Sequence, residues 1–324
     1  MVNIVLESNG VKIGVNSNKK EVIMTLIEKF GNYFNIVSEK ADFNISYLVY
    51  ELPIPLGEKY KELNEGEFNY VSGNDDNLFV FMKEYDIEKE DFVKRIFTNY
   101  YIKVLQKLGY TILHGACVSK NDQAIIICGD KRAGKTTTLL NFLKAGYDFI
   151  ANDRIAVKKI DNEFIVQGIP FSMGIILEDA LNYPGFDIAN KKIGIDKEVK
   201  KVYLESDDIS KIFDIYAKSY GIVKGILVPK YNPDIDSIQI EKVENNIPVL
   251  GNNIMYDDAI PSDKNFINDL INVKYTNPFS LLEINTYKIE QNADSYPELD
   301  EFVKNNIITK GKTYKYEIWF TRAY

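Results

Sequence analysis

Several features are scarce in this chain of 324 residues, and each scarcity excludes a class of protein. The two cysteines, Cys117 and Cys128, fall on successive expected strands, so we predict buried, reduced thiols rather than a disulfide framework. No apolar run approaches the roughly 18 residues that a membrane span requires. The first residues lack the basic and then apolar pattern of a signal peptide. These absences predict a cytoplasmic chain with no membrane partner.

Basic residues are also too few and too dispersed for a nucleic-acid binder. The chain has 39 Lys and Arg against 47 Asp and Glu, which gives a net charge of −8. Affinity for a phosphate backbone needs clustered positive charge. The short lysine pairs at 191–192 and 200–201 are typical of solvated loops. We therefore predict no nucleic-acid partner.

The length and composition are those of an ordinary globular protein with two or three domains. Hydrophobic residues make up 45% and charged residues 27% of the chain. We find neither an internal repeat nor a low-complexity tract. The pattern predicts an N-terminal α/β accessory domain over 1–95, a core over 96–240 and a C-terminal α/β region over 241–324.

Alternating and helical apolar patterns predict a mixed α/β fold. Strands are expected in most of the core and at both ends of the chain, with helices between them. Gly109 and Gly146 are expected to follow two of the helices as C-caps. The expected helices are 18–34, 88–110, 134–145, 172–183, 262–273 and 277–285. The expected strands are 2–7, 11–15, 41–52, 77–85, 111–120, 123–129, 147–153, 154–169 as a hairpin, 221–229 and 313–320. Residues 187–210 are expected to form a charged connection.

A phosphate-binding loop is the strongest motif. The stretch GDKRAGKT, residues 129–136, matches G-x-x-x-x-G-K-[ST] between an apolar strand and a helix, which is the setting that the motif requires. Backbone N–H groups and the helix N-terminus attract phosphate there. Lys135 can reach the β- and γ-phosphates, and Thr136 can place its hydroxyl on Mg²⁺. The predicted nucleotide-binding residues are Gly129, Asp130, Lys131, Arg132, Ala133, Gly134, Lys135, Thr136 and Thr137.

Two further residues stand at informative positions around this loop. His114, the sole histidine, lies 21 residues before Lys135, and Asp153 lies 18 residues after it. Asp153 ends the strand expected after the loop helix, where a carboxylate lies beside bound phosphates in open α/β sites. It can serve there as a metal ligand or as a general base. Taken alone, His114 could equally be a structural strand residue, and Asp153 a turn cap.

The segment resembles the HPr kinase/phosphorylase family and its relatives in the PEP-carboxykinase-like fold. The resemblance is carried by LHG at 113–115, GDKRAGKTT at 129–137, LKAG at 143–146 and FIAND at 149–153. It covers about 45 residues strongly, and both spacings equal those of the family. It implies an α/β, PEP-carboxykinase/HPr-kinase-like P-loop core with a mixed, twisted sheet, to which N-terminal and C-terminal α+β additions are attached.

The resemblance also implies roles for individual residues. His114, Lys135 and Asp153 would be catalytic, with Asp153 taking the proton from the acceptor hydroxyl and His114 orienting Asp153 or contacting a phosphate oxygen. Thr136, Asp153 and Glu178 would hold the metal, and Glu178 requires a shift of one residue in the alignment. Asn152 departs from the family, which has Asp there. That change would weaken the binding of a second metal ion, suppress the reverse phosphorolysis reaction or mark a degenerate site.

We therefore expect an ATP- and Mg²⁺-dependent kinase that phosphorylates a Ser or Thr hydroxyl of a peptide or protein. By resemblance, a ribosomally made precursor peptide is favoured over HPr, and homo-oligomers are compatible with the family. A small-molecule hydroxyl kinase and a nucleotide-binding regulatory or scaffold protein with little turnover remain alternatives, and Asn152 supports the latter. A GTPase is disfavoured because no N-K-x-D motif is present.

Overall fold

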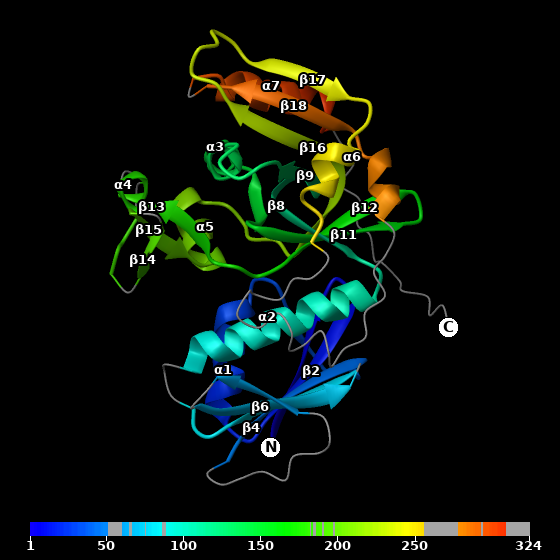
Figure 1. Cartoon of the computed structure of the whole chain (residues 1–324), viewed down its shortest axis with the longest axis vertical. Helices are drawn as coiled ribbons and strands as arrows, with labels where there is room; N and C mark the ends of the chain where they lie inside the picture. Colours follow the sequence, from blue (N-terminus) through cyan, green and yellow to red (C-terminus); the bar gives the residue numbers. More distant parts are fainter. Residues whose placement is uncertain are drawn as a thin grey trace. The chain divides into compact units, whose positions relative to one another are not determined.

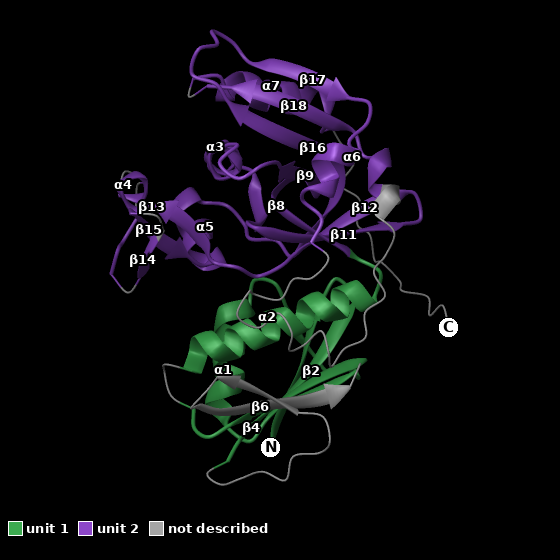
Figure 2. Ribbon diagram, viewed as in Figure 1, with its two compact units in different colours: residues 1–110, 256–276, 317–324 green, residues 111–255, 277–316 purple. Residues whose placement is uncertain are grey.

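The computed structural model describes residues 1–50, 60–64, 67–74, 76–85, 89–181, 183, 186–189, 191–196, 198–255, 278–292 and 294–308. The chain divides into two compact units, and the border between them falls after Tyr110 (Figure 2). Of the described residues, those up to 110 belong to the first unit, and 111–255, 278–292 and 294–308 belong to the second. The expected border at 95/96 falls inside a helix of the first unit. The expected border at 240/241 falls inside a strand of the second.

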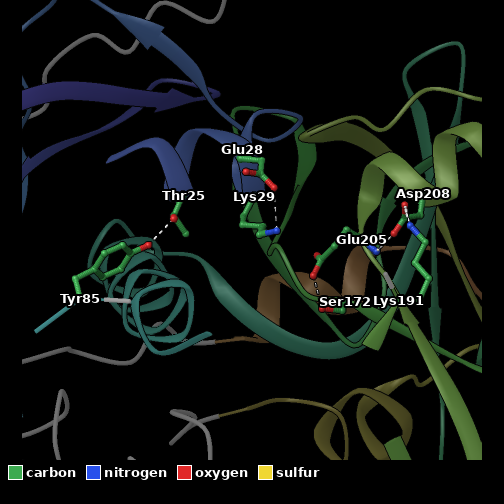
Figure 3. A network of polar contacts seen from close by, with 8 residues as sticks. All are labelled: Thr25, Glu28, Lys29, Tyr85, Ser172, Lys191, Glu205 and Asp208. Atoms are coloured by element: carbon green, nitrogen blue, oxygen red, sulfur yellow. Dashed lines mark hydrogen bonds and ion pairs between the residues drawn. The ribbon is translucent and has the colours of Figure 1, made fainter. Parts of the chain in front are cut away.

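In its described residues, the first unit contains a seven-stranded sheet and the helices α1 and α2 (Figure 1). Its strand order is β3-β1-β2-β4-β7-β6-β5, with parallel pairing between β2, β4 and β7. Apolar residues of α1 and α2 are buried, including Leu26 and Phe97. A hydrogen bond of 2.5 Å joins Thr25 on α1 to Tyr85 (Figure 3). The elements are β1 Val2–Ser8, β2 Val11–Ser17, α1 Lys20–Phe30, β3 Asn35–Val37, β4 Phe43–Val49, β5 Tyr60–Asn64, β6 Glu67–Asn74, β7 Asn77–Met82 and α2 Glu90–Lys107.

The second unit is built on a large mixed sheet. The strand order is β10-β8-β11-β12-β16-β18-β17, and β9 pairs with both β8 and β16. As a result, β8, β11, β12, β16 and β9 form a closed ring of paired strands. The elements are β8 Thr111–Lys120, β9 Gln123–Cys128, α3 Lys135–Lys144, β10 Asp148–Ala151, β11 Arg154–Ile160, β12 Glu163–Gly168, β16 Tyr220–Tyr231, β17 Gln239–Val243, α6 Ile247–Gly251, the 3₁₀ helix η3 Pro278–Glu283, β18 Thr286–Gln291 and α7 Tyr296–Asn306.

The core of this unit explains the two cysteines. Cys117 and Cys128 are fully buried free thiols on β8 and β9, as predicted. They lie in an apolar cluster that includes Leu113 and Ile126. Burial raises the pKa of both thiols, that of Cys128 to about 12, so they are packing residues rather than nucleophiles.

A small three-stranded sheet corrects two predictions. Residues 172–183, expected to be helical, form β13 Met173–Ile176 and a single helical turn, α4 Leu177–Ala180. The expected connection over 187–210 contains β14 Lys192–Asp196, β15 Val199–Leu204 and α5 Ser206–Phe213. Pairing of β13 with β15 buries Met173 and Ile175 at alternate positions, and this long-range pairing overrides the helical spacing.

Polar contacts hold the start of α5 beside this sheet (Figure 3). The Ser172 hydroxyl bonds to the Glu205 carboxylate at 2.9 Å. Glu205 and Asp208 form a reciprocal capping box, and Lys191 pairs with Asp208. Side chains with N-capping capacity therefore define where this helix begins.

Other predicted elements have mixed outcomes. As expected, a turn at Asn121–Asp122 connects β8 to β9, and a turn at Asp161 connects β11 to β12. These turn residues have positive φ. Residues 277–285 contain a 3₁₀ helix rather than an α-helix. The helix expected at 262–273 and the strand expected at 313–320 lie outside the described residues. In the part of the chain that is described, no helix is long and apolar enough to span a membrane.

The structure confirms the predicted mixed α/β fold, in which the loop of the phosphate-binding motif connects β9 to α3.

Candidate active site

The phosphate-binding motif forms the connection between β9 and α3. Gly129 and Gly134 have φ of 146° and 97°, which favour glycine. The Lys135 ammonium donates to the carbonyls of Gly129 and Asp130, at 2.8 and 2.9 Å. Burial lowers the pKa of Lys135, and the negative charges of Asp153 and Asp130 partly oppose this. The loop thus has the local shape and the cation that phosphate binding requires.

The helix behind the loop is anchored from a distant strand. The Thr138 hydroxyl donates to the Gly134 carbonyl at 3.0 Å. The amide of Gln291, on β18, donates to that same hydroxyl at 2.7 Å. Thr138 and Gln291 are fully or almost fully buried. A residue near the end of the described chain therefore holds the N-terminal turn of α3.

Strand pairing places His114 next to the loop. On one side of β8, Gly115 lies opposite Cys128, the residue just before the loop. On its other side, His114 lies opposite Arg154, the first residue of β11. The backbone N–H of His114 donates to the Asn253 carbonyl at 2.7 Å. The single imidazole therefore stands between the phosphate loop and the turn that carries Asp153.

His114 and Asp153 form a side-chain pair. The distance from His114 Nδ1 to Asp153 Oδ1 is 3.4 Å, and the two side chains are 40% and 43% exposed. Asp153 has a left-handed φ of 75°, and its carbonyl accepts from the Gly115 N–H at 3.0 Å. Arg154 Nε lies 3.7 Å from the other carboxylate oxygen. The Arg154 guanidinium also lies 4.7 Å from the centre of the Phe171 ring. The turn thus presents the carboxylate toward the imidazole.

Burial and nearby cations lower the pKa of the His114 imidazole and so favour its neutral form. Burial lowers the pKa of His114, Asp153 raises it, and the cationic Lys135, Arg154 and Lys131 lower it further. A neutral imidazole with its proton on Nδ1 can donate toward Asp153 and leaves Nε2 as an acceptor. The arrangement can orient a carboxylate general base beside a phosphate site.

The metal-binding prediction is less well supported by the geometry. Thr136 lies in the first turn of α3, beside the loop and half-buried. Glu178 is an exposed residue of α4, which packs against β13 and β15. Across the described ranges, no three His, Cys, Asp or Glu side chains form a metal cluster. The hydroxyl of Thr136 and the carboxylate of Asp153 are hard oxygen ligands of the type that Mg²⁺ prefers, so they fit the ion chemically. Glu178 as a ligand stays a prediction.

Two residues that motif reasoning did not identify support the site. The side-chain oxygen of Asn253 accepts from the Gly129 N–H at 3.4 Å, and its amide donates to the Val249 carbonyl at 2.7 Å. Through its backbone, Asn253 also binds His114. Gln291 holds Thr138 as described above. Neither residue lies at a recognisable spacing from the loop, so the sequence contains no local signal for them.

Comparison with known proteins supports an HPr kinase-like family. No protein-family model matches the chain. HPr kinase/phosphorylase from Clostridium tetani is 26% identical over 142 residues, which covers 43% of this chain and 40% of the relative. The enzymes of the same name from Levilactobacillus brevis and Lactiplantibacillus plantarum are each 30% identical, over 91 and 109 residues. These two matches cover 26% and 32% of this chain, and 29% and 34% of the relatives.

The matches are partial. The chain spans less than half the length of the curated relatives that it matches. Among solved structures, the Hpr(Ser) kinase/phosphatase from Coxiella burnetii aligns with a TM-score of 0.30 and 14% identity, over 60% of this chain and 94% of that one. The sequence matches confirm the resemblance to HPr kinase/phosphorylases that the motifs indicate.

Proposed function

We propose that this HPr kinase-like chain is an ATP-dependent kinase that transfers the γ-phosphoryl group to a Ser or Thr hydroxyl of a peptide or protein. The observation that carries the proposal is the 3.4 Å pairing of His114 with Asp153, at a strand end adjacent to the phosphate loop. Phosphoryl transfer needs a held triphosphate, a cation at its terminal oxygens and an acceptor oriented by a base. The loop, Lys135 and Asp153 match these three requirements in turn.

Each residue has a separate task in this proposal. The loop N–H groups and the N-terminus of α3 bind the phosphates. Lys135 exchanges its two carbonyl partners for phosphate oxygens and neutralises charge that develops on them. Asp153 accepts the proton of the acceptor hydroxyl, and neutral His114 holds the carboxylate in position. Thr136 and Asp153 would hold Mg²⁺, which supplies further charge neutralisation at the phosphates.

The acceptor is the least constrained part of the proposal. The relatives are named for HPr. The flanking regions of this chain do not resemble the family, which argues against HPr, and the resemblance to divergent members of the fold favours a ribosomally made precursor peptide. The proposal includes a cytoplasmic location and allows self-association. Asn152, where the family has Asp, removes one negative charge next to Asp153 and therefore favours the forward kinase reaction over phosphorolysis.

A second candidate function rests on the same residue. If Asn152 marks a degenerate site, the chain would bind ATP without turnover and act as a nucleotide-responsive scaffold. A small-molecule hydroxyl acceptor is the remaining variant of the kinase proposal. The experiments below separate binding from transfer, so they distinguish the scaffold from the two kinases.

The test measures transfer from labelled ATP to a panel of Ser- and Thr-containing peptides that includes HPr. Asp153→Asn should lower the transfer rate by about 10²–10⁴-fold, the usual contribution of a general base, with nucleotide affinity retained. Asp161→Asn is a matched control, because Asp161 also has positive φ but lies at the far end of β11. Full transfer by Asp153→Asn would refute the assigned base. ATP binding without transfer to any peptide would support the scaffold.

A further inference from the structure

The three-stranded sheet of β13, β14 and β15 has one buried face and one open face. Strand β15 pairs with β13 on one side and with β14 on the other (Figure 1). Residues opposite one another on paired strands share a face, so the register assigns each side chain to a face. The buried face carries Met173, Ile175, Val202 and Leu204. The opposite face, which we call the outer face, carries Gly174, Ile176, Lys192, Gly194, Val199, Lys201 and Tyr203.

Two glycines let the ring of Tyr203 lie flat on the outer face. Gly174 lies opposite Tyr203, and Gly194 lies opposite Lys201, one position along the same face. A β-carbon at Gly194 would lie 2.9 Å from the Tyr203 ring, and a β-carbon at Gly174 would lie 3.3 Å from it. The ring therefore fills the space that both side chains would occupy. Tyr203 is only partly buried, so the side of the ring that faces away from the glycines stays accessible.

The outer face also exposes aliphatic side chains. Ile176 on β13 is 41% exposed, and Val199 on β15 is 40% exposed. A sheet that buries one face normally presents polar side chains on its other face. Here Tyr203, Ile176 and Val199 give that face an apolar surface instead, and apolar surface left open to solvent is typical of interaction sites.

Positive charge accompanies this apolar surface. Lys192 lies directly opposite Tyr203, and Lys201 follows on the same face. Residues 191–204 contain five lysines against one Asp and one Glu, whereas the whole chain has a net charge of −8. The outer face therefore complements a ligand that carries an apolar group and a carboxylate. A symmetric contact between two copies of the chain would bring like charges together, so charge disfavours a second copy as the occupant.

The outer face lies within reach of the proposed base. Arg154 Nε is 3.7 Å from the Asp153 carboxylate, and the Arg154 guanidinium lies 4.7 Å from the centre of the Phe171 ring. Gly174 follows Phe171 by three residues, which is at most about 11 Å of chain. Tyr203, opposite Gly174, thus lies near the end of β13 that leads from the site. An extended peptide rises about 3.3 Å per residue, so about eight residues are enough to join a hydroxyl at Asp153 to the ring.

We propose that the outer face docks the acceptor, as a peptide segment with an aromatic residue and an adjacent acidic residue within about eight residues of the phosphorylated Ser or Thr. The aromatic side chain stacks on Tyr203, and the carboxylate pairs with Lys192 or Lys201. The inference rests on the proposed function and adds a recognition rule that the phosphate loop does not contain. The residues that flank a hydroxyl then decide whether it reaches Asp153.

The experiment measures the kinetics of transfer from ATP by the full chain to synthetic peptides. Each peptide has one central Ser in an Ala and Gly background, with about eight residues on either side. A Tyr-Asp pair is moved through the flanks position by position, and matched peptides carry Tyr-Lys or Ala-Ala instead. At the position that reaches the outer face, Tyr-Asp should lower KM by about 3- to 10-fold with kcat unchanged, since the stacking of two rings contributes a factor of that size.

Two variants test the aromatic contact. Tyr203→Leu should abolish the advantage of the Tyr-Asp peptide. Gly194→Ala keeps the tyrosine but displaces its ring, so it should reduce the same advantage. Tyr216→Leu is the matched control and should keep the full advantage, because Tyr216 is 76% exposed in the connection between α5 and β16 and lies outside this sheet.

A charge reversal tests the ionic contact. Lys201→Glu should invert the preference, so that the Tyr-Lys peptide then has the lower KM. The control is Lys200→Glu. Lys200 is an exposed neighbour on the same strand, and its side chain belongs to the other face. This variant should keep the preference of the wild type.

Several outcomes would overturn the docking site and leave the proposed kinase activity intact. These are equal KM values for all flanks, an advantage of Tyr-Asp that persists in Tyr203→Leu, and dissociation of an oligomer by Tyr203→Leu, which would assign the outer face to contacts between copies. If no peptide is phosphorylated, fluorescence anisotropy with the labelled peptides separates the two proposals. Binding of Tyr-Asp that depends on Tyr203 would support the outer face and refute the kinase, and an absence of binding would refute both.

Discussion

Replacement of Asp153 by Asn should lower the proton affinity of His114, and this tests the pairing at the centre of the site without any assay of activity. At the 3.4 Å separation of His114 Nδ1 and Asp153 Oδ1, two unit charges attract by about 1 kcal/mol in a water-like dielectric and about 5 kcal/mol at an effective dielectric of 20. Both side chains are about two-fifths exposed, so the lower figure applies. Loss of the carboxylate should therefore weaken proton binding by His114 roughly fivefold.

The direction of the expected pKa change follows from the surroundings of the imidazole. Burial and the cations Lys135, Arg154 and Lys131 lower the pKa of His114, and Asp153 is the group that raises it. In Asp153→Asn only the lowering influences remain, so the pKa must fall further. Asn also tolerates the left-handed backbone at this position, so the variant should keep the turn.

The assay is simple because His114 is the only histidine in the chain. In tag-free protein without Mg²⁺ or nucleotide, one imidazole signal can be followed by NMR as a function of pH. The wild type should titrate below the ordinary histidine range, and Asp153→Asn lower still. Asp161→Asn, at the opposite end of β11, should match the wild type. An unchanged or raised pKa in Asp153→Asn would refute the pairing.

Three further predictions concern the loop, its support and pH. Gly134→Ala forces a φ of 97° on a β-carbon and should cost about 1–3 kcal/mol in urea unfolding and weaken nucleotide binding, whereas Gly251→Ala, with open space at its β-carbon, should be nearly neutral. Gln291→Leu removes the bond to Thr138 and should cost about 1–3 kcal/mol, so unchanged stability would contradict the anchoring role. Folding lowers the pKa of His114. At pH values between the pKa of the folded chain and that of the unfolded chain, the unfolded chain therefore binds more protons. The free energy of unfolding should thus fall as pH drops through that window, and His114→Asn should flatten this slope.

The loop and the residues proposed to act with it could be predicted because their signals lie close together along the chain. The glycines at 129 and 134 stand where a backbone with positive φ is required, and Lys135 opens the helix. The family spacing predicts that His114 and Asp153 act together beside the loop, and the structure brings the two side chains into contact. Their 3.4 Å contact results from the pairing of β8 with β9 and β11, which are close neighbours along the chain.

The three-stranded sheet of β13, β14 and β15 shows where prediction from neighbouring residues alone fails. The spacing of apolar residues in 172–183 is compatible with a helix, yet β13 pairs with β15 about 30 residues later. Short apolar segments carry both patterns, and a distant partner decides between them. The same limit applies to Glu178, whose position depends on how this sheet and α4 are assembled.

The phosphate loop, the mixed α/β class and the residues that can do acid–base chemistry can be predicted from the order of amino acids alone, because backbone preference and residue chemistry act over a few neighbouring positions. Which distant residues support the loop depends on how the chain folds. Asn253 bonds to the loop and to the backbone of His114, and Gln291 anchors the helix that follows the loop. These contacts join segments about 100 to 150 residues apart, and burial in a shared core, rather than any spacing along the chain, selects them.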